Sequence, residues 1–264
     1  MGLSINKKER TQQIIVNTVR KELDENQYLR KDVKYTHFCY PLLGKEIMSI
    51  FFFVQSLGTS FLSSIYEEIA VVLANDRFKH IATQVKPHNQ ISTDAQHQIN
   101  MLMDGLLSVT IDMDPSHDIE RLRKVCQTGG FHQIDLPKVD VWLESFDGSL
   151  HLINMEILNP NKDNSEKIEN CKRRFLTWTG VELARNPDAK IKPLMGIPYN
   201  PYYPEPYQYW LMDGMLDRNH EVKVAEDLWS FIGGEGAYDD LLDCFEQAGI
   251  ELRSELDKYF QRFA

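Results

Sequence analysis

The sequence predicts an α/β fold, because stretches with helical spacing of apolar residues alternate with stretches in which every second residue is apolar. Strand-like alternation covers residues 134–158, and residues 191–197 form a further run of strand length. Amphipathic helices are expected at residues 8–23, 60–82, 97–107, 118–126, 166–185 and 239–263. We expect one domain over residues 1–264, with a mainly helical part over about 1–130 and a strand-containing part over about 131–264.

The individual segments follow from local spacing. In the first helix, Ile15, Val19 and Leu23 lie four positions apart on one face. Thr59 or Ser60 is a suitable N-cap for the helix expected at residues 60–82. Residues 48–54 include three consecutive phenylalanines but are too short to span a bilayer, so we expect a buried segment and no membrane association. Residues 229–235, with two adjacent glycines, are expected to form a turn.

Composition narrows the function classes. The four cysteines form no Cys-x-x-Cys pair, so neither a zinc site nor a disulfide framework is indicated. The N-terminus has no apolar secretory signal, and a reduced, cytoplasmic protein is expected. A formal charge of −10 argues against a surface coated with basic residues, although a local basic cleft remains compatible with it. No phosphate-binding glycine loop is present, which weakens an ATPase interpretation.

The most informative segment is a predicted hairpin with one acidic residue in each apolar strand. Asp140 lies in the first strand and Glu156 in the second, on either side of a turn at residues 147–148. Two carboxylates on neighbouring strands suit Mg²⁺, which prefers oxygen ligands and keeps several of its waters. Acidic residues in hairpins are more often solvated residues of an outer face. The spacing alone therefore makes a weak case for a metal site.

The register of this hairpin is a sharper test. Side chains alternate along a strand, so a two-residue turn would pair Asp140 with Met155 and send Asp140 and Glu156 to opposite faces. A shared metal ion excludes that pairing. We therefore expect a three-residue loop from Asp147 to Ser149, or a bulge in the hairpin.

Four groups of residues extend the pattern beyond the hairpin. They are KVDVWLE at 138–144, MEI at 155–157 with NPNK at 159–162, GIPYNPY at 196–202, and WSFIGG at 229–234 with YDDLL at 238–242. With these motifs, which span roughly residues 134–245, the chain resembles the type II restriction endonucleases of the TdeIII family. That family is part of the nuclease superfamily defined by a PD…(D/E)-x-K site.

The resemblance implies a restriction-endonuclease-like core, with a central mixed β-sheet flanked by helices. It implies Mg²⁺-dependent double-strand cleavage of a short G/C-rich palindrome of the GG…CC type, with Mn²⁺ as a substitute ion. A homodimer and a cognate DNA methyltransferase in the same system are expected partners. Asp140 and Glu156 match the two metal-binding acids, the backbone carbonyl of Ile157 is a further ligand, and an early-helix glutamate, Glu67 or Glu68, is a candidate fourth.

The chain departs from this pattern at Leu158, where the superfamily usually has a lysine that positions the attacking water. Three explanations compete: a lysine supplied from elsewhere, a natural loss of activity, or a substitution that traps an uncleaved complex. Lys162 is the nearest candidate for a relocated lysine, although it is equally consistent with a solvated turn residue, and Lys172 is second. The alternative function is therefore a catalytically impaired DNA-binding protein with a nuclease fold.

DNA contacts are predicted both before and after the strand expected at residues 191–197. Lys172, Arg173 and Arg174 follow the hairpin and are candidates for phosphate contacts, although such a cluster is more often a solvated helix face. Base-reading candidates lie in the Tyr- and Pro-rich region that follows residue 197, and include Asn200 and Gln208. A third interpretation is an unrelated globular protein whose hairpin acids are merely solvated.

Overall fold

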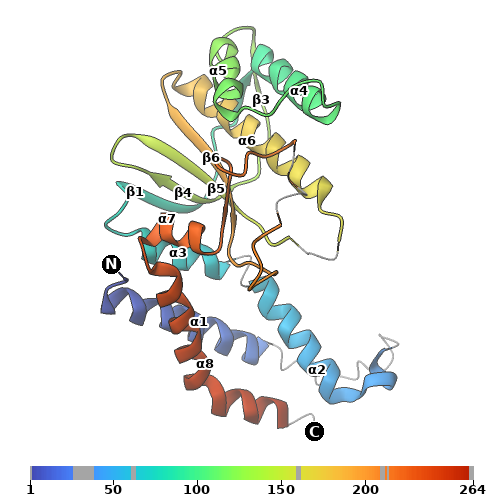
Figure 1. Ribbon diagram of the computed structural model, residues 1–264, viewed down its shortest axis with the longest axis vertical. Helices are drawn as coiled ribbons and strands as arrows, with labels where there is room; N and C mark the ends of the chain where they lie inside the picture. The colour runs from blue at the N-terminus through green and yellow to red at the C-terminus, as the bar shows by residue number, and fades with distance from the viewer. Residues whose placement is uncertain are drawn as a thin grey trace. The chain divides into compact units, whose positions relative to one another are not determined.

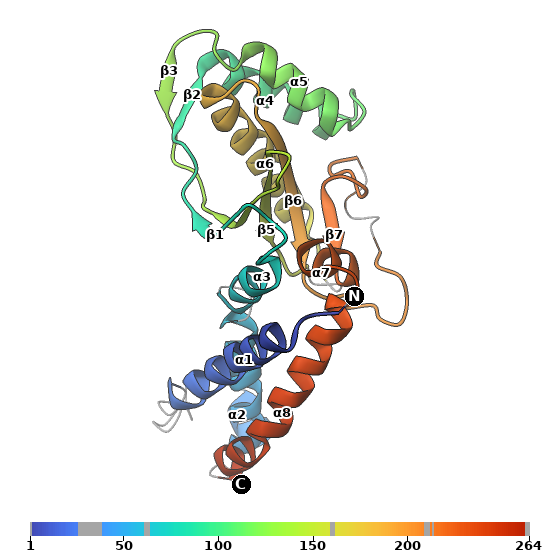
Figure 2. The same ribbon diagram turned by 90° about the vertical axis from the view of Figure 1, so that its left-hand side faces the viewer.

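The computed structural model describes residues 2–25, 39–60, 64–158, 162–208, 212 and 214–261. They form two compact units (Figure 1, Figure 2). The first unit comprises Met1–Leu73 and Gly234–Ala264, and the second comprises Ala74–Gly233. The single domain expected from the sequence stays a prediction.

The first unit is helical. It contains α1 (Ile5–Glu25), α2 (Cys39–Ser60), α3 (Tyr66–Ala74) and α8 (Ala237–Gln261). The pairing of α1 with α8 joins the two ends of the chain, and Arg20 reinforces it through Glu251 at 3.1 Å and Glu255 at 2.8 Å. These side chains are about two-fifths exposed, so the ion pairs add little to an apolar contact that includes Val16 and Leu252. The helices expected at 8–23 and 239–263 are confirmed.

Helix α2 is apolar on two sides. Met48 and Phe53 are buried, as expected for the segment 48–54. The expectation is wrong for Ile50, Phe51 and Val54, which are 40–61% exposed, because a helix turns successive side chains to different sides. Together with Ile47, which is 53% exposed, they form an outward apolar stripe after the kink at Gly44, where the backbone is not helical. An apolar helix normally has partners all round, so this outward stripe is unusual for a single chain.

The second unit is built on a five-stranded mixed sheet with the order β1-β4-β5-β6-β7. The strands are β1 (His80–Val85), β4 (Val139–Glu144), β5 (Ser149–Met155), β6 (Lys190–Ile197) and β7 (Val222–Val224). The pairs β1/β4 and β4/β5 are antiparallel, and β5/β6 and β6/β7 are parallel. Antiparallel pairing suits the tight hairpin, whereas the parallel β5/β6 pair needs a long crossover, which α6 (Ser165–Arg185) provides.

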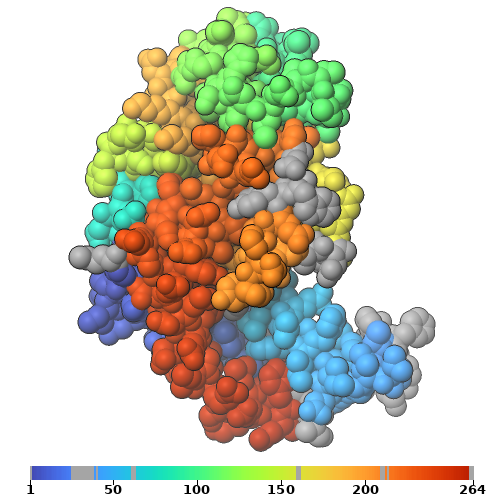
Figure 3. Space-filling view, in the orientation of Figure 1, coloured from blue at the N-terminus to red at the C-terminus, as the bar shows by residue number. Residues whose placement is uncertain are grey.

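Helices cover both faces of this sheet, as expected from the sequence. Helix α6 packs on one face, and α7 (Glu226–Gly233) packs on the other. The orange-red atoms of the segment around α7 are visible on the surface in Figure 3. Gly196 permits the close approach of α7, because a Cβ there would lie 3.0–3.1 Å from Met155, Ile153 and Leu228. The outer side of α6 is covered by helices α4 (Thr93–Leu107) and α5 (Pro115–Val125), together with the small sheet of β2 (Gln90–Ser92) and β3 (Phe131–Gln133).

Two sequence-based predictions of secondary structure are wrong. The helix expected at 60–82 ends at Ala74, where Asn75 and Asp76 interrupt it and Asp76 adopts a φ of 71°. Residues His80–Val85 then form the edge strand β1, so the part expected to be helical supplies one strand of the main sheet. Residues 229–233 of the turn expected at 229–235 are instead the second half of α7, and only Gly234 and Glu235 lie beyond its end. Among the described residues, no helix has the length and apolar character needed to cross a membrane.

Candidate active site

The register of the β4–β5 hairpin decides whether the two acids share a face. Glu144 pairs with Leu150 and Val141 with Ile153. The Ser145 amide donates to the Ser149 carbonyl at 2.9 Å, which closes a loop of three residues, 146–148. The loop has the expected length but begins one residue earlier than the predicted Asp147 to Ser149. Gly148 adopts a φ of 79°, as the last residue of such a loop requires.

This register places Asp140 opposite Asn154, one pair beyond Val141 and Ile153. Residues directly opposite in an antiparallel pair point to the same face, and Glu156 is two residues after Asn154. In this register, called the even register below, Asp140 and Glu156 point to the same face of the sheet. The prediction that the two acids share a face is therefore confirmed. The function of the pair as a metal site stays a prediction.

Asp140 is held at the point where the hairpin ladder ends. Its Oδ2 accepts a hydrogen bond from the backbone N–H of Met155 at 2.8 Å, and the Gln84 side chain from β1 also bonds to it. Burial raises the pKa of Asp140, and the nearby Glu156 carboxylate raises it further. The Met155 amide and the Arg174 guanidinium oppose that shift without cancelling it. A buried carboxylate with a raised pKa beside a second carboxylate is a characteristic arrangement of functional sites.

Glu156 follows the last residue of β5. Its backbone N–H donates to the Gly196 carbonyl at 2.9 Å, so the parallel β5/β6 pairing fixes the main chain here. Its carboxylate accepts a hydrogen bond from Asn154 Nδ2 at 3.3 Å and lies 3.5 Å from Lys167 Nζ. The side chain is 20% exposed, which leaves it accessible from outside.

One stripe of α6 runs along this end of the hairpin. Lys167 Nζ donates to the Ile157 carbonyl at 3.2 Å, and Arg174 donates to Asn154 Oδ1. Trp178 Nε1 donates to the Pro137 carbonyl at 3.2 Å, just before β4 begins. Lys167, Arg174 and Trp178 are seven and then four residues apart, which places them on one side of a helix. The helix therefore brings two cations to the acids and ties itself to the start of β4.

The donor set fits a hard divalent cation. Two carboxylates from one face of the sheet and the adjoining Ile157 carbonyl are oxygen ligands of the kind that Mg²⁺ prefers. Within the described ranges, no group of three or more His, Cys, Asp or Glu residues is arranged to hold a metal ion. Mg²⁺ requires fewer protein ligands than that, because it retains water molecules. Glu67 and Glu68 lie in the first turn of α3, in the other unit, and their participation stays a prediction.

The two lysines proposed from the sequence lie in different surroundings. Lys172 is fully buried, with Nζ 2.8 Å from Glu221 Oε1 and 3.3 Å from Asp118 Oδ2. Burial raises the pKa of both carboxyls despite the lysine charge. This ion pair joins α6 to α5 and to the turn before β7. Lys162 is exposed in the turn before α6.

Position 158 is equally informative. Leu158 is only 4% exposed, so its side chain belongs to the packed interior.

Sequence reasoning missed Lys167 and Asn154 as members of the site. The spacing of Lys167, Cys171, Arg174 and Trp178 on the helix after Glu156 is the signal that finds Lys167. Asn154 is found from the strand alternation that also carries Glu156.

An open depression adjoins the Arg174 side of the site. It has a volume of about 470 Å³, and its polar lining residues are Gln96, Asp135, Asn170, Arg173, Arg174 and Thr177. Arg173 is 41% exposed and lies 3.7 Å from Glu169, a weak surface ion pair that a phosphate can replace. The structure thus brings Arg173 and Arg174 to one surface, whereas the neighbouring Lys172 faces the interior.

The Tyr- and Pro-rich loop leaves the sheet at the same end as Glu156, because Gly196 of β6 pairs with Met155 of β5. Trp229 Nε1 donates to the Pro198 carbonyl at 2.8 Å and anchors the loop to α7. Asn200 braces the loop itself: its Nδ2 donates to the Glu205 carbonyl at 2.7 Å, and its Oδ1 accepts from the Tyr202 amide at 2.9 Å. Gln208 is exposed.

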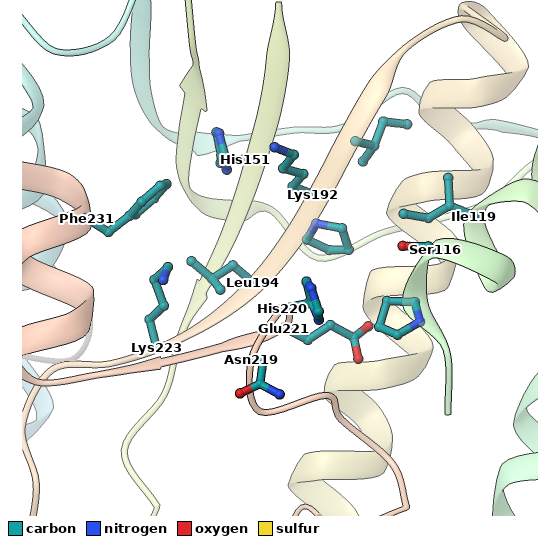
Figure 4. A pocket seen from close by; sticks show the side chains of 13 residues that line it. Ser116, Ile119, His151, Lys192, Leu194, Asn219, His220, Glu221, Lys223 and Phe231 are labelled. Carbon is teal, nitrogen blue, oxygen red and sulfur yellow. The ribbon is translucent and has the colours of Figure 1, made fainter. Parts of the chain in front are cut away.

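A second cavity of about 400 Å³ lies beside the first half of β6 (Figure 4), and its lining includes Glu221 but neither Asp140 nor Glu156. Lys192 and Lys223 lie on its wall with His151 and Phe231, and Lys223 Nζ is 5.3 Å from the centre of the Phe231 ring. Burial lowers the pKa of His151 to about 4, so this imidazole is neutral at pH 7. The charges around this cavity therefore come from other side chains.

Comparisons with known proteins agree with this geometry. A family model described as "Type II restriction endonuclease, HinfI" matches residues 6–249, most of the chain. The chain belongs to the HinfI family of type II restriction endonucleases. The narrower expectation of a TdeIII family member is not confirmed.

Individual relatives support the same family. The type II restriction enzyme HgiCII of Herpetosiphon aurantiacus is 25% identical over 230 residues, which cover 84% of this chain and 80% of the relative. HgiEI of the same organism is 24% identical over 251 residues, covering 90% of this chain and 87% of the relative. The similarity thus extends over both compact units, and the acids of the hairpin lie inside it.

A first prediction concerns the cost of keeping Asp140 charged. Because the folded state raises its pKa, the ionised carboxylate opposes folding at neutral pH, and this cost disappears as the pH falls below the folded pKa. Asp140→Asn keeps an oxygen that can accept the Met155 N–H and removes the charge. We expect the variant to melt at a higher temperature than the parent at pH 7, by roughly 2–4 °C for each kcal/mol relieved.

The gain in melting temperature is expected to shrink toward acidic pH, and calorimetry across a pH series measures it. Asp147→Asn is the matched control, because hydrogen bonds from Ser149 lower the pKa of Asp147 and its charge favours folding. The idea fails if Asp140→Asn is the less stable of the two variants at pH 7.

Proposed function

We propose that this protein is a Mg²⁺-dependent type II restriction endonuclease that cuts both strands of a short palindromic DNA site. The observation that carries the proposal is the even register of the hairpin, which presents Asp140 and Glu156 on one face in a chain of the HinfI family. Solvated outer-face acids would need no such register, and the Asp140 carboxylate is partly buried and accepts a hydrogen bond from the Met155 amide. A catalytic site therefore explains the pair better than two solvated acids do.

The residues of the site have separable tasks in this proposal. Asp140, Glu156 and the Ile157 carbonyl would hold Mg²⁺, with Mn²⁺ as a substitute. The bound ion supplies charge neutralisation at phosphorus and an ionised water near neutral pH. The Met155 amide fixes Asp140, and Asn154 orients both Glu156 and Arg174. Water attacks the phosphodiester in line, leaving a 5′-phosphate and a 3′-hydroxyl.

DNA is expected to approach over α6 and the loop after β6. Arg173 and Arg174 line the depression beside the acids and are the proposed phosphate contacts. Lys172 supports this surface from beneath through its buried ion pair. For base reading, Gln208 remains a candidate because it is exposed. The hydrogen bonds of the Asn200 side chain within the loop favour a role for Asn200 in shaping it.

The expected target is a G/C-rich palindrome of the GG…CC type, and a cognate DNA methyltransferase would protect that site in a cytoplasmic restriction-modification system. A palindrome is read naturally by a two-fold symmetric homodimer. The outward stripe of α2 supports a second copy as the partner. Its four apolar side chains, Ile47, Ile50, Phe51 and Val54, are 40–61% exposed, and the same stripe of a second copy would cover apolar surface that a single chain leaves in water.

A second candidate function is DNA binding without cleavage, and Leu158 is the observation that favours it. Without a lysine at that position, the site lacks the residue that usually offsets charge at the phosphate. The two functions differ in their product. A binder shifts DNA in a gel and leaves it intact in Mg²⁺ or Mn²⁺.

The main prediction is that incubation of plasmid and phage DNA with the protein in Mg²⁺ gives discrete fragments. Sequencing the fragment ends then gives the target and the cleavage position. Glu156→Gln removes one proposed ligand charge with little change of shape, and we expect at least about a hundredfold slower cleavage. Asp163→Asn, an exposed acid in the turn before α6, is the control that should cut normally. Intact DNA at every protein concentration, with a gel shift, would favour the binder instead.

The DNA surface gives a separate prediction. Each phosphate contact adds about one unit to the slope of log K against log salt, so Arg173→Ala is expected to lower that slope by roughly one. Fluorescence anisotropy with a short duplex measures it in Ca²⁺, which allows binding without turnover. Arg185→Ala, at the far end of the same helix, should leave the slope unchanged. Equal slopes for both variants would exclude Arg173 as a contact.

The homodimer is tested by mass. We expect light scattering to give twice the chain mass for the parent protein. Phe51→Glu, in the middle of the α2 stripe, is expected to give single chains, because two buried charges of like sign would meet. Mixing it with Phe51→Lys should restore the dimer, which excludes misfolding as the cause. Ile250→Glu, an exposed apolar site on α8, is the control. A parent protein of single-chain mass, or a Phe51→Glu dimer, contradicts this interface.

A further inference from the structure

We propose that Lys167, from the first turn of α6, supplies the ammonium group that position 158 lacks. The inference rests on the proposed nuclease function and assigns one more residue to that same site. Lys167 Nζ lies 3.2 Å from the Ile157 carbonyl oxygen and 3.5 Å from Glu156 Oε2. These are two of the three oxygen donors of the proposed metal site. A single lysine therefore contacts the acid and the main chain immediately next to it.

The geometry distinguishes Lys167 from the other two lysines of this segment. Lys172 is fully buried, and its ammonium is committed to Glu221 and Asp118. Lys162 lies exposed in the turn that precedes α6. Lys167 is half exposed, with 49% of its side chain accessible, so its long stem can turn toward a bound phosphate without leaving the site.

The burial of Leu158 explains why the charge comes from the helix. Its side chain is 4% exposed, so a lysine at 158 would bring its stem and its charge into a buried position, where loss of hydration is costly. Helix α6 approaches the same oxygens from outside the sheet. Leucine can therefore stand at position 158, because Lys167 of α6 brings the positive charge to the site from another direction.

The stripe that holds Lys167 also fixes its position. Four residues further on, Cys171 lies against Asn154, and seven residues further on Arg174 donates to the same asparagine. Asn154 donates in turn to Glu156 at 3.3 Å. Any displacement of α6 would move Lys167 and Arg174 together relative to the acids. The helix therefore acts as one cationic edge of the site.

Three variants test the assignment, with cleavage of a target duplex and binding of Mn²⁺ without DNA as the two measurements. Lys167→Ala is expected to cut on the order of a hundredfold more slowly while binding the duplex within about threefold of the parent. Lys167→Arg should recover part of the rate. Lys162→Ala removes the same charge from the neighbouring turn, and its rate should stay within about threefold of the parent.

Manganese binding gives the readout that does not depend on turnover. An ammonium at Glu156 competes with a divalent cation, so Lys167→Ala is expected to bind Mn²⁺ several-fold more tightly, as followed by electron paramagnetic resonance. Lys162→Ala should bind it as the parent does. A structural role for Lys167 would instead weaken both Mn²⁺ binding and thermal stability.

The outcomes separate this proposal from the nuclease function. If the parent cuts and Lys167→Ala cuts equally fast, the assignment of Lys167 is wrong and the nuclease stands. If the parent does not cut, the nuclease function fails, and unchanged Mn²⁺ binding in Lys167→Ala would overturn the assignment as well. Leu158→Lys adds a further check. It is expected to melt at a lower temperature and cut no faster, and a faster, equally stable variant would contradict the relocated lysine.

Discussion

The hydrogen bond from the Met155 amide to the Asp140 carboxylate is the interaction on which the site depends. Up to Val141 and Ile153 the two strands pair through their main chains, and at the next position a side-chain oxygen receives the Met155 N–H. The strands can therefore separate at this end without leaving that donor unsatisfied. This separation gives Glu156 and Ile157 room beside Asp140. It is available only in an even register, since a slip of one residue turns Asp140 to the other face.

The position of α6 is the second constraint, and it depends on a buried charge. Lys172 points away from the acids into a pair of carboxylates from α5 and the segment before β7, while Lys167 and Arg174 point toward the acids. A buried ion pair contributes little net stability, but a shift of α6 would leave charges unpaired in the interior. The pair thus specifies where α6 lies. Because α6 is fixed in this way, the side chains of Lys167 and Arg174 are held beside the acids.

The sequence predicts the parts of this arrangement that repeat at a regular period. The hairpin, the helix that follows it and strand β6 are all recognisable from the spacing of apolar residues, and the family motifs add the mixed sheet. Strand β1 is not predicted from the sequence, because an edge strand with little burial has no clear alternation of apolar residues. Helix α7 is not predicted because its glycines resemble a turn. Lys167 is missed for a different reason. Lys162 is nearer to Glu156 in sequence, but α6 brings residue 167 to it in space, and only the docking of the helix decides between them.

The negative net charge of the chain constrains where the site can obtain positive charge. A protein with formal charge −10 must bring a polyanion to a pair of carboxylates, one of them already buried at a cost. Attraction over the whole surface is not available, so the positive charges must be local and well held. In the proposed site, Lys167 and Arg174 supply them from one helix, on the side of the acids where the strands separate. A lysine at 158 would add a third cation from the interior, where its desolvation would oppose folding. Moving that charge to a half-exposed helix position preserves attraction for phosphate and leaves the sheet with an apolar Leu158 to pack.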